Sequence, residues 1–357
     1  MQEISIKLAN RVFKCERWRC TDGRYLQAEL PKEHQGQHFG PYLRSYILHQ
    51  AYYQGVTRNL LLGQLREWGI QISEGQLNNI LIKAKDSYHA EKRNIFEAGC
   101  RSASYLQADD TGNRHGGKNG YCTYIGNEHF AFYESSHSKS RLNFLHCLAK
   151  ALPGAIGLHL DEDALYYLKQ TPKMSLKIMD ILGHVISAPE FFYTEIELQS
   201  YLEKYGITSL HDVRACTEAA LFSPLKRFLY PLPEQKNQLR QRFYELCTPI
   251  ENETALNKIL SRVKRWEEKL LLVLDCPFLP LHDNTSEGDI REIVRRRKVS
   301  GGTRHHLGRE CRDTFASLKK TCQKVGVTFW DYLIDRTFQQ QKIPPLAEYV
   351  RAKALKN

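Results

Sequence analysis

Apolar residues recur at helical spacing from about residue 40, which predicts a helical region over residues 39–100. One helix opens near Val56 and ends at Gly69. Its expected apolar face consists of Leu60, Leu61, Leu65 and Trp68. Ser73 and Gln76 have capping-box spacing, so a second helix should begin there. Its expected buried residues are Leu77, Ile80, Leu81 and Ala84.

Two helices joined by a tight glycine turn have the outline of a helix-turn-helix, whose second helix enters the major groove of DNA. The same outline fits plain packing in a helical bundle, and the two interpretations carry about equal weight. DNA binding is slightly favoured by the nearby cations Lys83, Lys85, Lys92 and Arg93.

After Gly99 the apolar period changes from helical to alternating. The predicted strands are Tyr105–Ala108, Tyr121–Ile125, His129–Glu134 and Ala155–Leu160. A glycine-rich turn over residues 116–120 precedes the second strand, and a helix with Leu142, Leu145 and Leu148 precedes the fourth. The order strand, strand, strand, helix, strand predicts an α/β core.

Residues 171–275 show few alternating stretches and are expected to form a helical insertion, with polar helices at Glu234–Leu246 and Leu256–Leu272. After Pro277 and Pro280 a compact segment runs to Arg336, and a basic tail follows.

Two aspartates follow predicted strands, Asp109 after the first and Asp161 after the fourth. Carboxylates at strand ends can converge on a metal ion. Asp also commonly caps turns and helices, and for either residue alone that interpretation is favoured. The two together indicate a metal site more strongly than each by itself.

A third candidate lies in residues 282–304, where Asn284, Thr285 and Ser286 are expected to cap a helix that starts near Glu287. Glu287 and Arg291 then share a helical face at i,i+4 spacing. The segment's cations and loop residues form a candidate phosphate clamp that also includes Lys118 of the earlier glycine turn: Arg291, Arg295, Arg296, Arg297, Lys298, Thr303 and Arg304. A solvated basic face is the alternative.

The chain has 357 residues, enough for two or three packed units, and its 51 Lys and Arg exceed its 40 Asp and Glu. The excess implies an anionic partner, either nucleic acid or a membrane surface. No apolar run is long enough to span a membrane and the start lacks a signal-peptide pattern, so we expect a cytoplasmic protein. The ten cysteines contain no C-x-x-C pair, which favours ordinary thiols over a zinc cage.

Three sequence patterns together resemble insertion-sequence transposases of the sixty-six family over residues 40–335. They are Asp109-Asp110-Thr111-Gly112 with the Gly-Gly-Lys-Asn-Gly turn, the Ser-Glu-Gly-Asp-Ile-Arg segment at 286–291, and the Arg-Arg-Lys-Val-Ser-Gly-Gly-Thr-Arg run at 296–304. The resemblance implies an RNase H-like catalytic core that carries an Asp, Asp, Glu triad. Together with the residue patterns, it divides the chain into a degenerate N-terminal segment (1–38), a helical region that is a candidate for DNA binding (39–100), the first part of the core (101–170), the insertion (171–275), the end of the core (276–336) and the tail (337–357).

Matched residue by residue, the resemblance assigns the triad to Asp109, Asp161 and Glu287. It prefers Asp109 to Asp110, and it leaves Asp163 as the competitor of Asp161 and Glu292 as a poor candidate. Three departures from the family's pattern are Gly288 in place of Arg, His282 in place of Asp, and a zinc ribbon reduced to Cys15 and Cys20.

The resemblance therefore implies a DNA transposase that cleaves and transfers strands of double-stranded DNA, at element ends and target. The triad would hold two Mg²⁺ or Mn²⁺ ions about 4 Å apart, bridged by Asp109. Pairing of two DNA ends implies a homodimer, whereas a need for accessory proteins stays open. The alternatives are an RNase H-like nuclease that does not join strands and a non-catalytic DNA-binding protein derived from a transposase.

Overall fold

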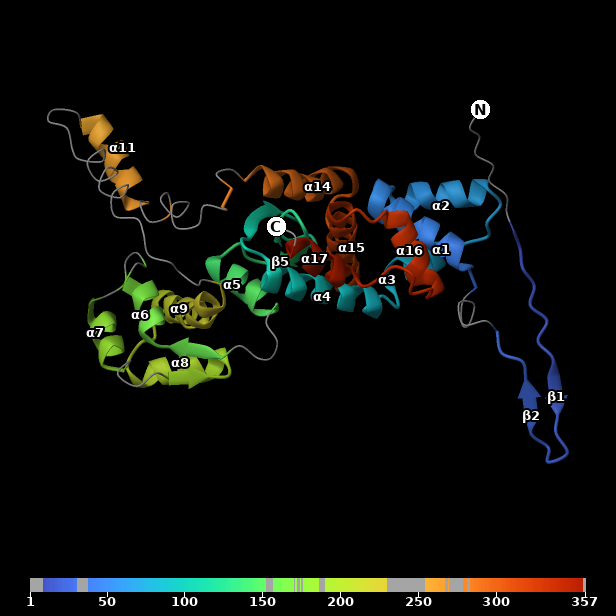
Figure 1. The fold of residues 1–357 in the computed structure, drawn as a ribbon, viewed down its shortest axis with the longest axis horizontal. Coiled ribbons are helices and arrows are strands. Elements are labelled where there is room, and N and C mark those ends of the chain that lie inside the picture. Colours follow the sequence, from blue (N-terminus) through green and yellow to red (C-terminus); the bar gives the residue numbers. More distant parts are fainter. Residues whose placement is uncertain are drawn as a thin grey trace. The chain divides into compact units, whose positions relative to one another are not determined.

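The computed structural model describes residues 9–30, 38–151, 157–169, 171, 174, 176–185, 190–229, 254–266, 269, 279–280 and 283–355. The chain forms two compact units, Met1–Lys139 with Thr285–Asn357, and Ser140–Asn284. Each combines helices with a small sheet, which confirms a mixed α/β fold (Figure 1). His282, one of the departures from the family's pattern, and the predicted helix Glu234–Leu246 lie outside the described residues.

The first unit opens with a hairpin and a group of helices. Their bounds are β1 Arg17–Arg19, β2 Tyr25–Gln27, α1 Pro41–His49, the π-helical turn η2 Gln50–Gln54, α2 Arg58–Glu67, α3 Glu74–Ile82 and α4 Asp86–Ser102. The capping box is confirmed, because the Ser73 hydroxyl accepts from the Gln76 amide and the Gln76 side chain accepts from the Ser73 amide. Gly69, at φ +80°, follows α2 as predicted.

Two buried positions were predicted wrongly in this region. Leu60 is 68% exposed, because the buried face of α2 passes through Leu61 and Leu65 alone. Ala84 is exposed and lies beyond the end of α3 at Ile82, where the backbone turns to a positive φ of 53°.

A three-stranded antiparallel sheet in the order β3-β4-β5 forms the centre of the first unit. The strands are β3 Gln107–Gly112, β4 Tyr121–Gly126 and β5 Ala131–Ser136. The prediction that the first strand ends before Asp109 is wrong. Cross-strand pairing continues from Gln107↔Gly126 to Gly112↔Tyr121, so Asp109 lies within β3, opposite Tyr124. A polar stretch can continue this strand because β3 is at the sheet edge and partly exposed.

Alternate residues of each strand point to opposite faces of this sheet, and different helices cover the two faces. One face packs against α14 (Asn284–Ser300) and α15 (His306–Val325) through a buried cluster of Cys122, Tyr124, Ala131, Tyr133, Ile290, Ile293 and Ala316. The other face packs against α4, where Phe96 stacks on Phe132 with ring centroids 3.8 Å apart and Lys92 pairs with Glu134 at 2.6 Å.

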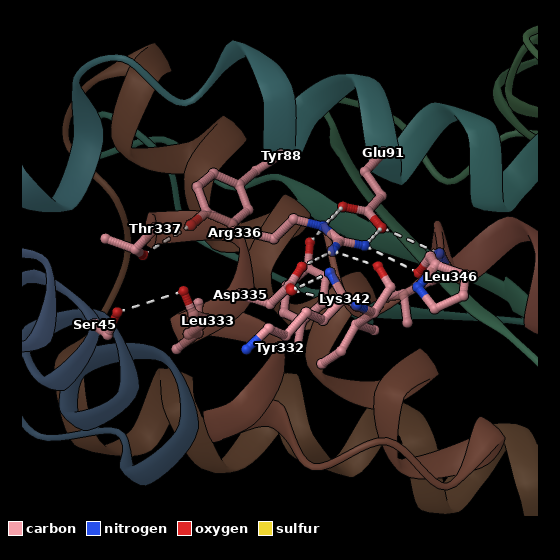
Figure 2. Close-up of polar contacts among 12 residues, drawn as sticks. Ser45, Tyr88, Glu91, Tyr332, Leu333, Asp335, Arg336, Thr337, Lys342 and Leu346 are labelled. Atoms are coloured by element: carbon pink, nitrogen blue, oxygen red, sulfur yellow. Dashed lines mark hydrogen bonds and ion pairs between the residues drawn. The ribbon is translucent and has the colours of Figure 1, made fainter. Parts of the chain in front are cut away.

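Helices α16 (Phe329–Phe338) and α17 (Leu346–Ala354) complete the first unit. Figure 2 shows how Glu91 of α4 joins them: its carboxylate accepts from Arg336 at 2.8 and 3.0 Å, from the Tyr332 hydroxyl at 2.8 Å and from the Leu346 amide at 3.1 Å. The Asp335 carboxylate accepts from the amides of Lys342 and Ile343, which fixes the loop between the two helices.

The second unit contains the two-stranded sheet β6-β7 and several helices. Their bounds are α5 Arg141–Ala149, β6 Leu158–Leu160, α6 Glu162–Lys169, α7 Leu176–Val185, β7 Glu190–Phe192, α8 Glu195–Lys204, α9 Leu210–Leu229 and α11 Thr254–Arg265. Of the strand predicted over Ala155–Leu160, the described part is β6, while residues 155–156 lie outside the description. No helix in the described ranges of the chain has the length and apolar character needed to cross a membrane.

Candidate active site

Asp109 and Asp110 point to opposite faces of the three-stranded sheet. Asp109 is paired with Tyr124, so its side chain lies on the face that α14 covers. It is half-buried, and one carboxylate oxygen accepts from the Asp110 amide at 2.7 Å. Asp110 is paired with Thr123, whose hydroxyl donates to its carboxylate at 2.5 Å on the α4 face. Geometry thus separates two acids that are adjacent in the sequence.

Glu287 lies on α14, which begins at Asn284, three residues before the predicted start. The prediction that Ser286 caps this helix is therefore wrong, since Ser286 belongs to the first turn and is fully buried. The Glu287 side chain is 58% exposed, and Arg291 lies one turn on with its guanidinium 3.4 Å from the carboxylate. The predicted i,i+4 pair is confirmed, and it leaves most of the Glu287 carboxylate open to solvent.

Buried polar contacts fix α14 along the sheet. The Asp289 carboxylate accepts from the Tyr124 hydroxyl at 2.8 Å and lies 2.9 Å from Lys320 and 2.7 Å from Lys324. The Tyr133 hydroxyl donates to the Asp289 carbonyl at 3.0 Å. The lysines belong to α15, so this cluster joins the sheet to both covering helices. Sequence reasoning missed Asp289, because an acidic residue in a basic segment gives no signal that it is buried.

At the other end of α14, Arg297 donates to the carbonyl of Gly112, the last residue of β3. Eight residues of helix separate this contact from Asp289, a rise of about 12 Å. Helix α14 therefore runs beside β3 in the same direction. Glu287 lies two residues before Asp289, and Asp289 meets Tyr124, the cross-strand partner of Asp109. Glu287 therefore belongs to the helix that covers the sheet face on which Asp109 lies.

The cations of the basic segment have different surroundings. Arg291, Arg295 and Lys298 are exposed. Arg296 points into the protein, where its guanidinium donates to the Ala51 carbonyl at 3.1 Å and lies 5.0 Å from the centre of the Tyr52 ring. Burial lowers the pKa of Arg296, a shift that Tyr52 opposes and Arg312 reinforces to a smaller extent. Arg291, Arg295 and Lys298 are therefore open to solvent, whereas the Arg296 guanidinium is not.

The two glycine loops that the sequence suggested lie side by side. The Gly116 amide donates to the Thr303 carbonyl at 2.8 Å, the Thr303 amide donates to the Arg114 carbonyl at 3.1 Å, and the Thr303 hydroxyl is 2.8 Å from His115 Nδ1. A Cβ at Gly302 would lie 2.3 Å from the Arg114 carbonyl oxygen, so the approach requires glycine. Exposed Lys118 and Arg304 extend from this junction.

Asp161 belongs to the second unit and directly follows β6, as predicted. It is 4% exposed. One carboxylate oxygen accepts from the Ala164 amide at 3.1 Å, as a helix cap does, and the other accepts from the Ser223 hydroxyl at 2.6 Å. Asp163 lies half-buried in the first turn of α6.

The donor atoms at these positions are carboxylate oxygens. Across the described ranges, no group of three or more His, Cys, Asp or Glu side chains is placed to hold a metal ion. Asp109 and Glu287 come from segments far apart in the sequence and both belong to the first unit, whereas Asp161 lies in the other.

Comparisons with known proteins point to one family. Residues 225–310, which include Glu287 and the basic segment of α14, match the family described as Transposase IS66 family. The chain is also 32% identical over 327 residues to a protein of Sinorhizobium fredii (strain NGR234) described as an uncharacterized protein, y4jO. That match covers 73% of this chain and 100% of the relative. No solved structure matches the chain.

Proposed function

Because the chain belongs to the Transposase IS66 family, we propose that it is a DNA transposase that cleaves DNA strands at the ends of a mobile element and joins them to a target. The observation that carries this proposal is that Asp109 lies on the face of the β3-β4-β5 sheet that α14 covers, and that α14 carries Glu287. The antiparallel order β3-β4-β5 supports the proposal of an RNase H-like core, whereas β6 pairs with β7 in a separate sheet.

Asp109 and Glu287 fit divalent metal ions by their chemistry. Both are oxygen donors of the kind that Mg²⁺ and Mn²⁺ prefer, and both are partly exposed. The Asp109 carboxylate accepts a hydrogen bond from the neighbouring Asp110 amide, and the Glu287 carboxylate lies 3.4 Å from the Arg291 guanidinium. Two bound ions would stabilise the attacking and leaving oxygens of an in-line displacement at phosphorus.

We propose Asp161 as the third carboxylate and keep Asp163 as its competitor. Asp161 would exchange its hydrogen bond from the Ser223 hydroxyl for a bond to the metal ion. Three carboxylates that share a site repel one another in the absence of a cation, so bound metal would stabilise them.

The remaining residues of the proposed site would hold and orient DNA. Exposed Arg291, Arg295, Lys298, Arg304 and Lys118 would bind backbone phosphates, and this binding would weaken steeply with salt. We further propose that α2 and α3 act as a helix-turn-helix that reads the element ends, and that a homodimer pairs the two ends.

The decisive experiment measures Mg²⁺- and Mn²⁺-dependent nicking and strand joining on double-stranded DNA that carries the element's own ends. Native protein is compared with Asp109→Asn, Asp161→Asn and Glu287→Gln. Asp110→Asn is the matched control for Asp109, because its carboxylate lies on the opposite face of β3. Asp163→Asn is the matched control for Asp161.

We expect the three triad variants to lose both reactions and keep DNA binding, while the two controls stay active. Nicking without joining by the native protein would favour a nuclease. DNA binding with no reaction in either metal would favour a non-catalytic DNA-binding protein. Loss of activity in Asp110→Asn but not in Asp109→Asn would overturn the assignment of the first carboxylate.

A further inference from the structure

Residues 9–30 contain a short β-hairpin whose turn is well defined. The Cys20 amide donates to the Arg24 carbonyl at 2.8 Å, and the Gly23 amide donates to the Cys20 carbonyl at 3.0 Å. Gly23 adopts a φ of +82°, which favours glycine. Asp22 accepts from the Arg24 amide and pairs with its guanidinium, and these contacts lower the pKa of Asp22. The hairpin therefore has one register.

The two faces of this hairpin differ in chemistry. Cross-strand pairs Arg17↔Gln27 and Arg19↔Tyr25 lie on one face, and Trp18↔Leu26 lies on the other. All six strand residues are exposed, with Trp18 at 67% and Tyr25 at 55%. An isolated two-stranded hairpin is marginally stable in water. A bound partner that covers one face of this ribbon would therefore stabilise it.

Charge identifies the partner of the arginine face. Residues 9–30 hold five Lys and Arg against three Asp and Glu. Two of the acids have contacts within the hairpin: Glu16 accepts from the Trp18 indole, and Asp22 pairs with Arg24. In the described part of the chain, neither Arg17 nor Arg19 has a carboxylate within ion-pair distance. The Arg17 guanidinium lies 4.1 Å from the centre of the Tyr25 ring, which holds it on this face.

We propose that this ribbon is a second DNA-binding element, which places Arg17 and Arg19 on backbone phosphates of a DNA duplex. The inference rests on the proposed function, since it takes DNA as the substrate. A two-stranded ribbon fits the major groove, and arginine suits phosphate because its guanidinium donates two parallel hydrogen bonds. The ribbon would add affinity without depending on zinc at Cys15 and Cys20.

The test uses the full chain and the salt dependence of its affinity for duplex DNA. The double variant Arg17→Ser/Arg19→Ser should have a slope of log affinity against log salt that is shallower by about 1.8. Each lost phosphate contact removes about 0.9 from the magnitude of this negative slope. Arg17→Lys with Arg19→Lys keeps both charges and should retain the native slope. Lys342→Ser with Arg351→Ser removes the same charge from exposed positions elsewhere and should also retain it. Thermal melting should be unchanged in all three.

A second measurement does not depend on substitutions. Trypsin should cleave the free native protein after Arg17, Arg19 and Arg24, and duplex DNA should suppress this cleavage. An unchanged slope in the serine pair, or cleavage unaffected by DNA, would overturn the ribbon proposal while strand nicking and joining could still stand. A native chain that binds no DNA would overturn the proposed function and the ribbon together.

Discussion

Asp289 is a buried carboxylate of α14 that lies against two lysines and a tyrosine. Burial lowers the pKa of Lys324, and the adjacent Asp289 opposes that shift by favouring the charged ammonium. Asp289→Asn should destabilise the first unit by roughly 3–5 kcal/mol, because it leaves a buried cation without its counter-charge. Urea unfolding measures this loss. Adding Lys324→Met to Asp289→Asn should restore part of the lost free energy of unfolding. A loss below about 1 kcal/mol in Asp289→Asn alone would contradict the prediction.

His49 makes folding sensitive to acid. Its ring stacks on Tyr53 with centroids 4.7 Å apart and also contacts Phe329 and Trp330. Burial lowers the pKa of His49, and the Lys319 ammonium adds to the effect. Since the folded pKa lies below the unfolded value of about 6.5, stability is present above that pH and is lost as pH falls through the folded pKa.

His49→Gln should therefore lose less stability than native protein between neutral and mildly acidic pH. The pKa values of His89 and His115 are also lowered by burial, so the informative quantity is the difference between native and variant in urea unfolding. Parallel pH profiles for the two proteins would contradict the prediction.

The residue types of the candidate site could be read from the sequence, whereas their orientation could not. The choice of Asp109 over Asp110 came from resemblance and stays a prediction, while strand alternation places their side chains on opposite faces of β3. This orientation was hidden in the sequence because the strand was expected to end before both residues. The inward orientation of Arg296 was equally hidden, since its partner Ala51 is 245 positions away in the chain.

Gly302 decides how closely the two glycine loops approach. A Cβ there would overlap the Arg114 carbonyl, so Gly302→Ala should separate the loops that carry Lys118 and Arg304. We expect nicking to fall by roughly tenfold to a hundredfold, since displacements of about 1 Å at a reacting site have that effect. Gly308→Ala on α15 is the matched control, because its Cβ meets nothing within 4 Å. Equal activity in the two variants would show that the approach is not needed.

Among helices and strands, the sequence correctly predicted the boundaries that depend on neighbouring residues alone. The capping box at Ser73 and the glycine after α2 depend on neighbouring residues, and both are confirmed. The extent of β3 depends on pairing with β4, and the start of α14 depends on packing of Ser286 in the core. These long-range contacts override the local signals, which is why both boundaries were predicted wrongly.

At the scale of the whole molecule, two compact units should unfold separately. Glu91 stabilises the first, where its side chain is 11% exposed and joins α4 to α16 and α17 (Figure 2). Glu91→Gln should lower one calorimetric transition by roughly 6–12 °C and leave the other in place, as expected for losing a buried ion pair in a unit of this size. Glu97→Gln removes an exposed i,i+4 pair from the same helix and should shift it by only about 1–2 °C.

A second variant, Ser223→Ala, tests the stability of the second unit. Ser223 is fully buried and donates to Asp161, so Ser223→Ala leaves one oxygen of a buried carboxylate without this donor. This substitution should lower the transition that Glu91→Gln leaves in place, and it should not move the other. If either variant shifted both transitions equally, the two units would be one cooperative structure. Separate shifts would mean that the unit holding Asp161 unfolds independently of the unit that holds Asp109 and Glu287.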